Sequence, residues 1–230
     1  MSLVIAAPTP VHVPVRGGGE FPVRRVYCVG RNYAEHAVEM GFTGREPPFF
    51  FLKPADAVVV VGEGETGVID YPSLTKNLHH EIELVVAIGR GGRNIKAAEA
   101  AAHIYGYAVG LDMTRRDLQN DMKKQGRPWC IGKAFDQSAP IGPIVPIGQT
   151  GELTRGAITL SVGGVVRQKG DLSELIWNVA ETIEHLSTAW LLQPGDLIYS
   201  GTPAGVAAVI SGDVMEGSIE GVGTLRVAVR

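Results

Sequence analysis

The chain has 230 residues, of which 45% are hydrophobic and 20% charged, and its formal net charge is −3. The cationic residues form no stripe, so neither nucleic acid nor a membrane surface is an expected partner. Two cysteines, Cys28 and Cys130, are too few for a disulfide framework. No apolar run reaches about 18 residues and no signal peptide is visible, so we expect a cytoplasmic protein without a membrane span.

Thirty glycines and fourteen prolines separate many short apolar segments, which indicates a β-rich chain with few long helices. Residues 1–23 are expected to form an extended N-terminal arm, and residues 24–230 a single domain. The expected strands cover residues 25–29, 49–52, 58–61, 80–88, 105–111, 159–168 (a hairpin), 196–199 and a last hairpin ending at 229. The expected helices cover residues 33–40, 96–104, 114–126 and, as the longest, 172–192.

Three acidic residues lie where apolar strands are expected. Glu81 and Glu83 alternate within one strand, so both side chains point to the same face, about 7 Å apart. Buried like charges at that distance require a cation or protons. Asp112 follows the next apolar strand and could supply a third carboxylate. Such a hard ligand set favours Mg²⁺, Mn²⁺ or Ca²⁺, whereas the alternative is a solvated strand face and an unrelated aspartate.

Two histidines, His79 and His80, precede these glutamates. Neither an H-E-x-x-H pattern nor a cysteine-rich spacing accompanies them, which argues against zinc. We expect one of them to orient a metal ligand by a hydrogen bond.

An acid–base pair is predicted on the first short helix. His36 and Glu39 are three residues apart, which places them on one helix face. A carboxylate beside an imidazole orients the ring and raises its basicity, as a general base for water requires. The alternative is an ordinary surface pair.

Lys133 lies in an apolar stretch and could bind an anion or an oxyanion, or could be a surface lysine. The same two readings apply to Arg31, Lys53, Arg115 and Gln119.

Six segments resemble motifs of the fumarylacetoacetate hydrolase family, in the family's order: residues 30–40, 51–54, 78–84, 110–117, 132–133 and 200–206. The resemblance implies the α+β class, with a β-rich, rolled, mixed sheet and short flanking helices, in one catalytic domain that forms a homodimer. It also implies that Glu81, Glu83 and Asp112 bind Mg²⁺ or Mn²⁺, and that His36 and Glu39 activate water.

The resemblance further implies substrate contacts. Lys133 and Gln119 would contact the substrate's oxygens. From charge, and not from the resemblance, Arg31, Lys53, Arg115 or Thr202 could hold its far carboxylate. One departure is Cys130, because an acidic residue or threonine more often follows the tryptophan at the position of Trp129. This difference affects the fit of the substrate, since the lysine itself is retained.

The implied reaction is metal-dependent hydrolysis of a carbon–carbon bond in an acylpyruvate, a small dioxo acid. Residues 21–27, 45–51 and 79–89 are most similar to the bacterial fumarylpyruvate hydrolases of gentisate-type aromatic degradation, which implies fumarate and pyruvate as products. Acylpyruvase, oxaloacetate decarboxylase and hydroxy-dienoate isomerase members share the same motifs and stay open as alternatives. A carboxylate-binding module without catalysis is a further alternative.

Overall fold

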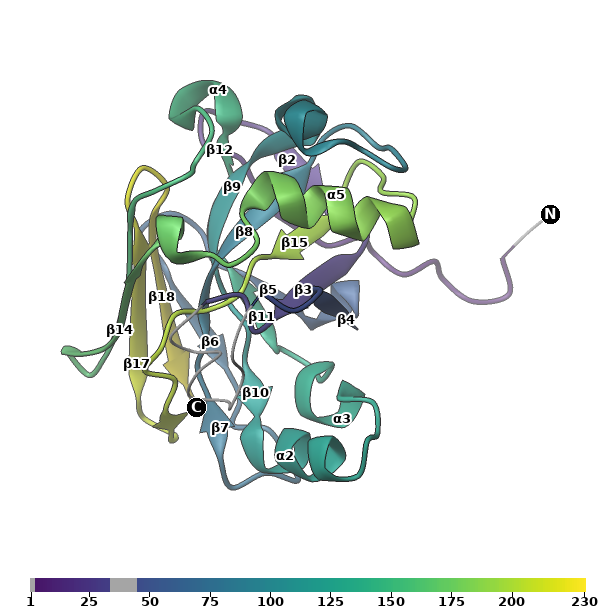
Figure 1. Ribbon diagram of the computed structural model, residues 1–230. Coiled ribbons are helices and arrows are strands. Elements are labelled where there is room, and N and C mark those ends of the chain that lie inside the picture. Colours follow the sequence, from purple (N-terminus) through teal and green to yellow (C-terminus); the bar gives the residue numbers. More distant parts are fainter. Residues whose placement is uncertain (1–2, 34–44) are drawn as a thin grey trace.

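The computed structural model describes residues 3–33 and 45–230. Its largest element is an eight-stranded mixed sheet in the order β4-β3-β15-β8-β9-β11-β5, with β12 paired to β9 (Figure 1). Strand β15 is parallel to β3 and β11 is parallel to β5, whereas β8 and β9 are antiparallel. The strands are β3 (Val26–Gly30), β4 (Phe49–Lys53), β5 (Val58–Val60), β8 (Ile82–Ile88), β9 (Ile104–Leu111), β11 (Ala139–Ile141), β12 (Val145–Pro146) and β15 (Leu197–Tyr199).

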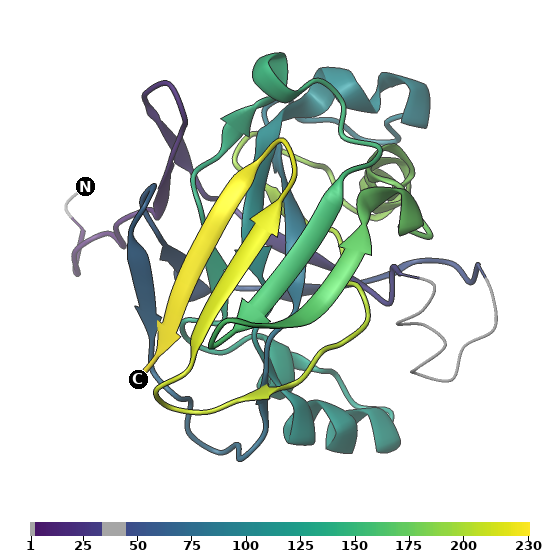
Figure 2. The same ribbon diagram turned by 90° about the vertical axis from the view of Figure 1, so that its left-hand side faces the viewer.

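A five-stranded sheet in the order β14-β13-β17-β18-β6 covers one face of the large sheet. Figure 2 shows its outer face toward the viewer. Its inward side chains, such as Leu160 and Met215, share one apolar core with Leu84 and Val109 of the large sheet. The strands are β6 (Thr66–Ile69), β13 (Ala157–Val162), β14 (Val165–Asp171), β17 (Val214–Ile219) and β18 (Gly223–Val229).

Short helices flank the sheets. The α-helices are α2 (Arg116–Lys124), α3 (Cys130–Lys133), α4 (Ile147–Thr150) and α5 (Val179–Ala189), and the 3₁₀ helices are η1 (Ala55–Ala57), η2 (Ala97–His103) and η3 (Leu172–Glu174). The single long helix predicted over 172–192 is wrong. Asp171 and Asn178 each cap a new helix with a capping box, so the chain forms η3 and then α5.

The N-terminal segment is more structured than a simple extended arm. Residues 3–10 are exposed, but β1 (His12–Pro14) and β2 (Glu20–Pro22) form a hairpin. Val13 and Phe21 of this hairpin are buried against Val85 of β8 in a second apolar core.

The predicted fold class is confirmed, because the chain is a β-rich α+β protein with a curled mixed sheet and short flanking helices. Among the described residues, no helix is both long enough and apolar enough to cross a membrane. A small three-stranded sheet, with β7 (Leu78–His79) between β10 (Thr114–Arg115) and β16 (Ala208–Val209), lies beside one end of β8 and β9. At this end the functional side chains collect.

Candidate active site

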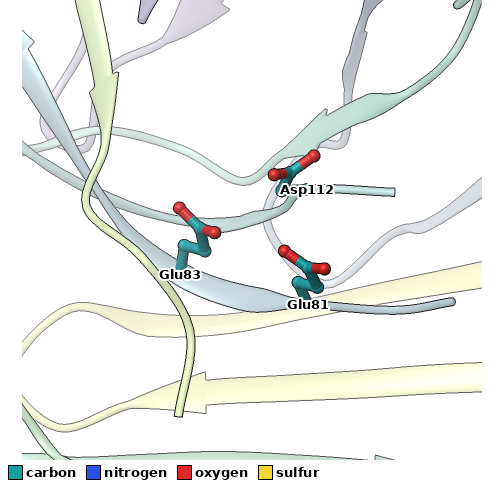
Figure 3. A group of neighbouring side chains, drawn as sticks. All are labelled: Glu81, Glu83 and Asp112. Atoms are coloured by element: carbon teal, nitrogen blue, oxygen red, sulfur yellow. The ribbon is translucent and has the colours of Figure 1, made fainter. Parts of the chain in front are cut away.

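Three buried carboxylates meet where β8 begins and β9 ends. The antiparallel register pairs Ile82 with Leu111, and the backbone N–H of Asp112 donates to the carbonyl of Glu81 over 2.8 Å. One ligand oxygen from each of Glu81, Glu83 and Asp112 lies within 4.8 Å of the others. Figure 3 shows the three carboxylates turned toward a common space.

Lys133 is the main counter-charge of this cluster. Its Nζ lies 2.9 Å from Oε2 of Glu81, 2.6 Å from Oδ2 of Asp112 and 2.6 Å from Oγ1 of Thr114. Burial alone would lower the pKa of Lys133, but Asp112 and Glu81 raise it above its ordinary value. The ammonium is therefore charged, and its three hydrogens each have a partner.

Two further cations complete the balance. Lys53 Nζ lies 2.8 Å from Oδ1 of Asp112, and the guanidinium of Arg116 pairs with Oε1 of Glu81. Arg116 also donates to Oε1 of Gln119 over 2.6 Å. Three buried carboxylates thus face three buried cations, which is the arrangement that makes such burial tolerable.

Glu83 is the least satisfied of the three acids. Its Oε2 accepts a hydrogen bond of 2.8 Å from the backbone N–H of Gly201. Burial, then the charges of Asp112 and Glu81, raise the pKa of Glu83 well above its ordinary value. Gly201 has φ +100°, and a Cβ there would lie 2.7 Å from that of Asn32, so only glycine suits this turn.

This donor set fits a divalent cation. The site offers three convergent carboxylates, a hard oxygen set that Mg²⁺, Mn²⁺ and Ca²⁺ prefer. A cation at this point would also relieve the repulsion that raises the pKa of Glu83.

Two adjoining cavities open at the cluster. The inner one, of about 20 Å³, is lined by the three carboxylates together with Arg31, Gln119 and Thr202, among other residues. The outer one, of about 560 Å³, is lined mainly by aromatic and apolar side chains, including Phe49 and Trp129, and by Cys130. Both cavities share Arg31, Phe51, Trp129 and Lys133 in their lining.

Arg31 marks the junction of the two cavities. Its φ of 57° is left-handed, a conformation that non-glycine residues adopt rarely and that often marks functional sites. The guanidinium carbon lies 5.2 Å from the ring centroid of Phe49 and 5.8 Å from that of Trp129. These rings hold a cation in the passage between the inner and outer spaces.

Most residues predicted for the site line the inner cavity, namely Arg31, Glu81, Glu83, Asp112, Gln119, Lys133 and Thr202. Two predicted substrate contacts do not line either cavity. Lys53 is buried behind Asp112, and the guanidinium of Arg115 lies 4.4 Å from the ring centroid of Phe135 and donates to the carbonyl of Ile131. His36 and Glu39 lie outside the described residues.

Arg116 is a cavity residue that our reading of the sequence missed. The available signal was its spacing, because Arg116 and Gln119 are three residues apart on α2 and therefore share a face.

The two histidines before the carboxylates do not belong to the cluster. His79 Nε2 lies 2.9 Å from Oδ1 of Asn77, and His80 Nδ1 lies 2.9 Å from Oε1 of Gln168. Burial lowers the pKa of His79 to about 4, so this ring is neutral near pH 7. Among the described residues, neither of these two hydrogen bonds is to a carboxylate, so they do not support the expected role of orienting a metal ligand.

Comparisons with known proteins agree with this geometry. Residues 25–230 match the family model described as fumarylacetoacetate (FAA) hydrolase C-terminal. A crystal structure of fumarylpyruvate hydrolase from Pseudomonas aeruginosa in complex with Mn²⁺ and pyruvate is 57% identical, with a TM-score of 0.97 and 99% of each chain covered. Fumarylpyruvate hydrolase from Ralstonia sp is 45% identical over 184 residues, which are 80% of this chain and 93% of that protein. The mitochondrial oxaloacetate tautomerase of Rattus norvegicus is 40% identical over 203 residues, which are 88% of this chain and 90% of that protein.

Proposed function

This chain belongs to the fumarylacetoacetate hydrolase family, and we propose that it is a metal-dependent hydrolase that cleaves fumarylpyruvate into fumarate and pyruvate. The observation that carries the proposal is the buried cluster of Glu81, Glu83 and Asp112 at the inner end of an aromatic cavity. The cluster fits the metal, and the cavity fits an acyl arm.

Glu81, Glu83 and Asp112 would hold Mg²⁺ or Mn²⁺, and Ca²⁺ suits the same donors. When bound, the ion supplies a Lewis acid and a template for the oxygens of a 2-oxo acid. Lys53 and Arg116 hold Asp112 and Glu81 from behind, so these two cations keep the ligand carboxylates in place.

The two cavities suit the two ends of the substrate. The inner cavity, of about 20 Å³, is much smaller than the outer cavity of about 560 Å³, so the acyl arm fits the outer cavity. We assign the far carboxylate to Arg31, because its guanidinium lies at the junction. Gln119 uses its oxygen to accept from Arg116, which leaves its amide hydrogens to donate to a substrate oxygen.

Lys133 is our candidate partner for the oxyanion that forms when water adds to the acyl carbonyl. Its hydrogens are all used within the cluster, so this role requires one of them to change partner. The Thr114 hydroxyl is the neutral partner of the three and is the least costly to release.

We propose that His36, oriented by Glu39, removes the proton from the attacking water. The carbon–carbon bond then breaks, and the methylene carbon that leaves takes up a proton to give pyruvate. The described residues on either side of this segment both contact Trp177: Asn32 donates to its carbonyl over 2.8 Å, and the guanidinium carbon of Arg45 lies 4.1 Å from its ring centroid. His36→Ala should lose hydrolysis far more than Mn²⁺ affinity, and wild-type hydrolysis by this variant would place the base elsewhere.

The direct test is an absorbance assay of fumarylpyruvate consumption with Mg²⁺, with Mn²⁺ and after EDTA. We expect metal-dependent loss of the diketone absorbance with equal amounts of fumarate and pyruvate. The relation to oxaloacetate tautomerase supports a second candidate, in which the same site acts on oxaloacetate. Turnover of oxaloacetate without turnover of fumarylpyruvate would favour that candidate and overturn the first.

We also propose that the protein is a homodimer in the cytoplasm, as the family resemblance implies. Sedimentation equilibrium of the purified protein tests the dimer, and a monomer at micromolar concentration would contradict it.

A further inference from the structure

Gln168 is a fully buried polar residue on a strand that is otherwise largely exposed. The pairing of β14 with β13 jumps from Ser161–Val166 to Leu160–Gln168, so Arg167 is an extra residue in a β-bulge. A bulge re-aims the following side chain, and here it turns Gln168 to the inner side occupied by Leu160.

The turn that carries Thr202 packs directly on this bulge. Gly205 has φ +93°, and a Cβ there would lie only 2.1 Å from the carbonyl oxygen of Arg167. The glycine therefore permits the close approach that brings the 200–205 turn within reach of the Gln168 side chain.

The Gln168 amide forms four hydrogen bonds. Its Oε1 accepts from the backbone N–H of Ile82 over 3.1 Å and from Nδ1 of His80 over 2.9 Å. Its Nε2 donates to Oγ1 of Thr202 and to the carbonyl of Pro203, both over 2.8 Å. A backbone N–H can only donate and a carbonyl can only accept, so these partners fix which end of the amide is oxygen.

This arrangement determines the role of the Thr202 hydroxyl. Because both hydrogens of the Gln168 amide are used, Oγ1 of Thr202 is an acceptor, and its own hydrogen must be donated elsewhere. Within residues 3–33 and 45–230, no second partner of this hydroxyl occurs, and Thr202 lines the inner cavity beside Glu83. The hydrogen is thus available to an oxygen bound in that cavity.

We propose that Gln168 is a positioning residue that makes Thr202 a hydrogen-bond donor toward the bound oxo acid. The inference rests on the proposed function, since it supposes that an oxygen of the bound oxo acid enters the inner cavity. Through Ile82, which lies between Glu81 and Glu83, the same amide ties this donor to the strand that carries the metal ligands. Gln168 acts through Thr202 and does not itself line either cavity.

The test is a double-mutant cycle on the Mn²⁺-loaded protein, with pyruvate as the probe. Gln168→Glu keeps an oxygen for Ile82 and His80 but replaces the NH₂ group by an acceptor, so the Thr202 hydroxyl turns away from the cavity. Thr202→Val removes the hydroxyl. A hydrogen bond to a charged group corresponds to about a 10- to 100-fold loss of pyruvate affinity, which we expect in each variant.

The KM for fumarylpyruvate should rise in parallel, whereas Mn²⁺ affinity should stay within about threefold of wild type, because no metal ligand is changed. The double variant should lose no more than either single variant, and Thr202→Ser, which retains the hydroxyl, should bind pyruvate as the wild type does. Gln149→Glu, an exposed glutamine on α4, is the matched control and should change nothing.

Thermal unfolding identifies the folded variants, and Gln168→Met replaces Gln168→Glu if the buried carboxylate prevents folding. Losses that add in the double variant, or wild-type pyruvate affinity in either Gln168 variant or in Thr202→Val, would overturn the inference and leave the proposed function intact. A wild-type protein that neither binds pyruvate nor hydrolyses fumarylpyruvate would overturn the proposed function, and this inference with it.

Discussion

The inner and outer walls of the site differ in how they are built. The inner wall consists of three carboxylates and two cations, with a third cation, Lys53, behind Asp112, and all six are buried: Glu81, Glu83, Asp112, Lys133, Arg116 and Lys53. The outer wall consists of half-buried aromatic side chains and an exposed cysteine: Phe49, Phe51, Trp129 and Cys130. The central pair β8 and β9 positions much of the inner wall, whereas the edge strand β4 and the short helix α3 position the outer wall. The difference indicates that the inner wall determines turnover and the outer wall determines which acid is accepted.

The largest effect should come from breaking the inner wall at a metal ligand. Glu83→Gln keeps the shape and the contact with Gly201 but removes a charge that would bind the cation. Because a Lewis acid contributes several kcal/mol, we expect kcat/KM to fall by about 10³-fold or more. Metal titration and the fumarylpyruvate assay check this, with the exposed Glu216→Gln as control. Full activity of Glu83→Gln would remove Glu83 from the metal site.

Lys133→Met should reveal how much of the inner wall depends on charge balance. It leaves Glu81 and Asp112 buried without their shared partner, which costs about 3–5 kcal/mol of unfolding free energy. Added Mn²⁺ should raise the melting temperature of this variant more than that of the wild type. Chemical denaturation measures the loss, and exposed Lys96→Met should stay within about 0.5 kcal/mol of wild type. Equal stabilities of the two variants would contradict the charge-balance argument.

The junction of the two walls is tested at Arg31. Arg31→Met should raise the KM for fumarylpyruvate about 10- to 100-fold, because a charged hydrogen bond to the far carboxylate is lost. The KM for an acylpyruvate without a second carboxylate should change by less than about threefold. Arg93→Met, at an exposed arginine that lines neither cavity, is the matched control. An equal rise in KM for both substrates would show that Arg31 does not bind the far carboxylate.

The smallest effect is a pH dependence. The pKa of Glu83 is raised above its ordinary value of 4.5, so the folded, metal-free protein binds this proton more tightly than the unfolded chain does. Its stability therefore falls as pH rises from 4.5 toward the raised pKa. Over the same range Mn²⁺ affinity should rise by up to about tenfold per pH unit, since binding displaces the proton. Calorimetric titrations at several pH values test this, and Glu83→Gln should lack the slope.

Sequence patterns predicted the parts of the site that depend on local geometry. Glu83 and Asp112 follow from strand alternation and from a strand's end, and Glu81 lies just before β8 yet still reaches the cluster. The two helix starts at Asp171 and Asn178 could also have been predicted from the sequence, because a glutamate follows each of them by three residues.

Other parts depend on pairings between distant segments. Whether Arg115 or Arg116 lines the inner cavity depends on the residue at which α2 begins. Gln168 faces inward because of a single extra residue in its strand, and a shift of one residue reverses every facing side chain. The spacing of Arg116 and Gln119 predicts that they share a helix face, but the residue at which α2 begins and the bulge at Arg167 depend on the segments that pack against them.

The charge balance of the inner wall affects the order in which the metal and the organic acid bind. When all three carboxylates are ionised they balance the three cations, so a dicarboxylate that meets the metal-free protein finds little net attraction there. Arrival of a divalent ion gives the wall a net charge of about +2, and only then does it attract an anion strongly. We therefore expect the metal to bind first and the acid second. When metal is scarce, the metal-free enzyme would bind little of the organic acids around it.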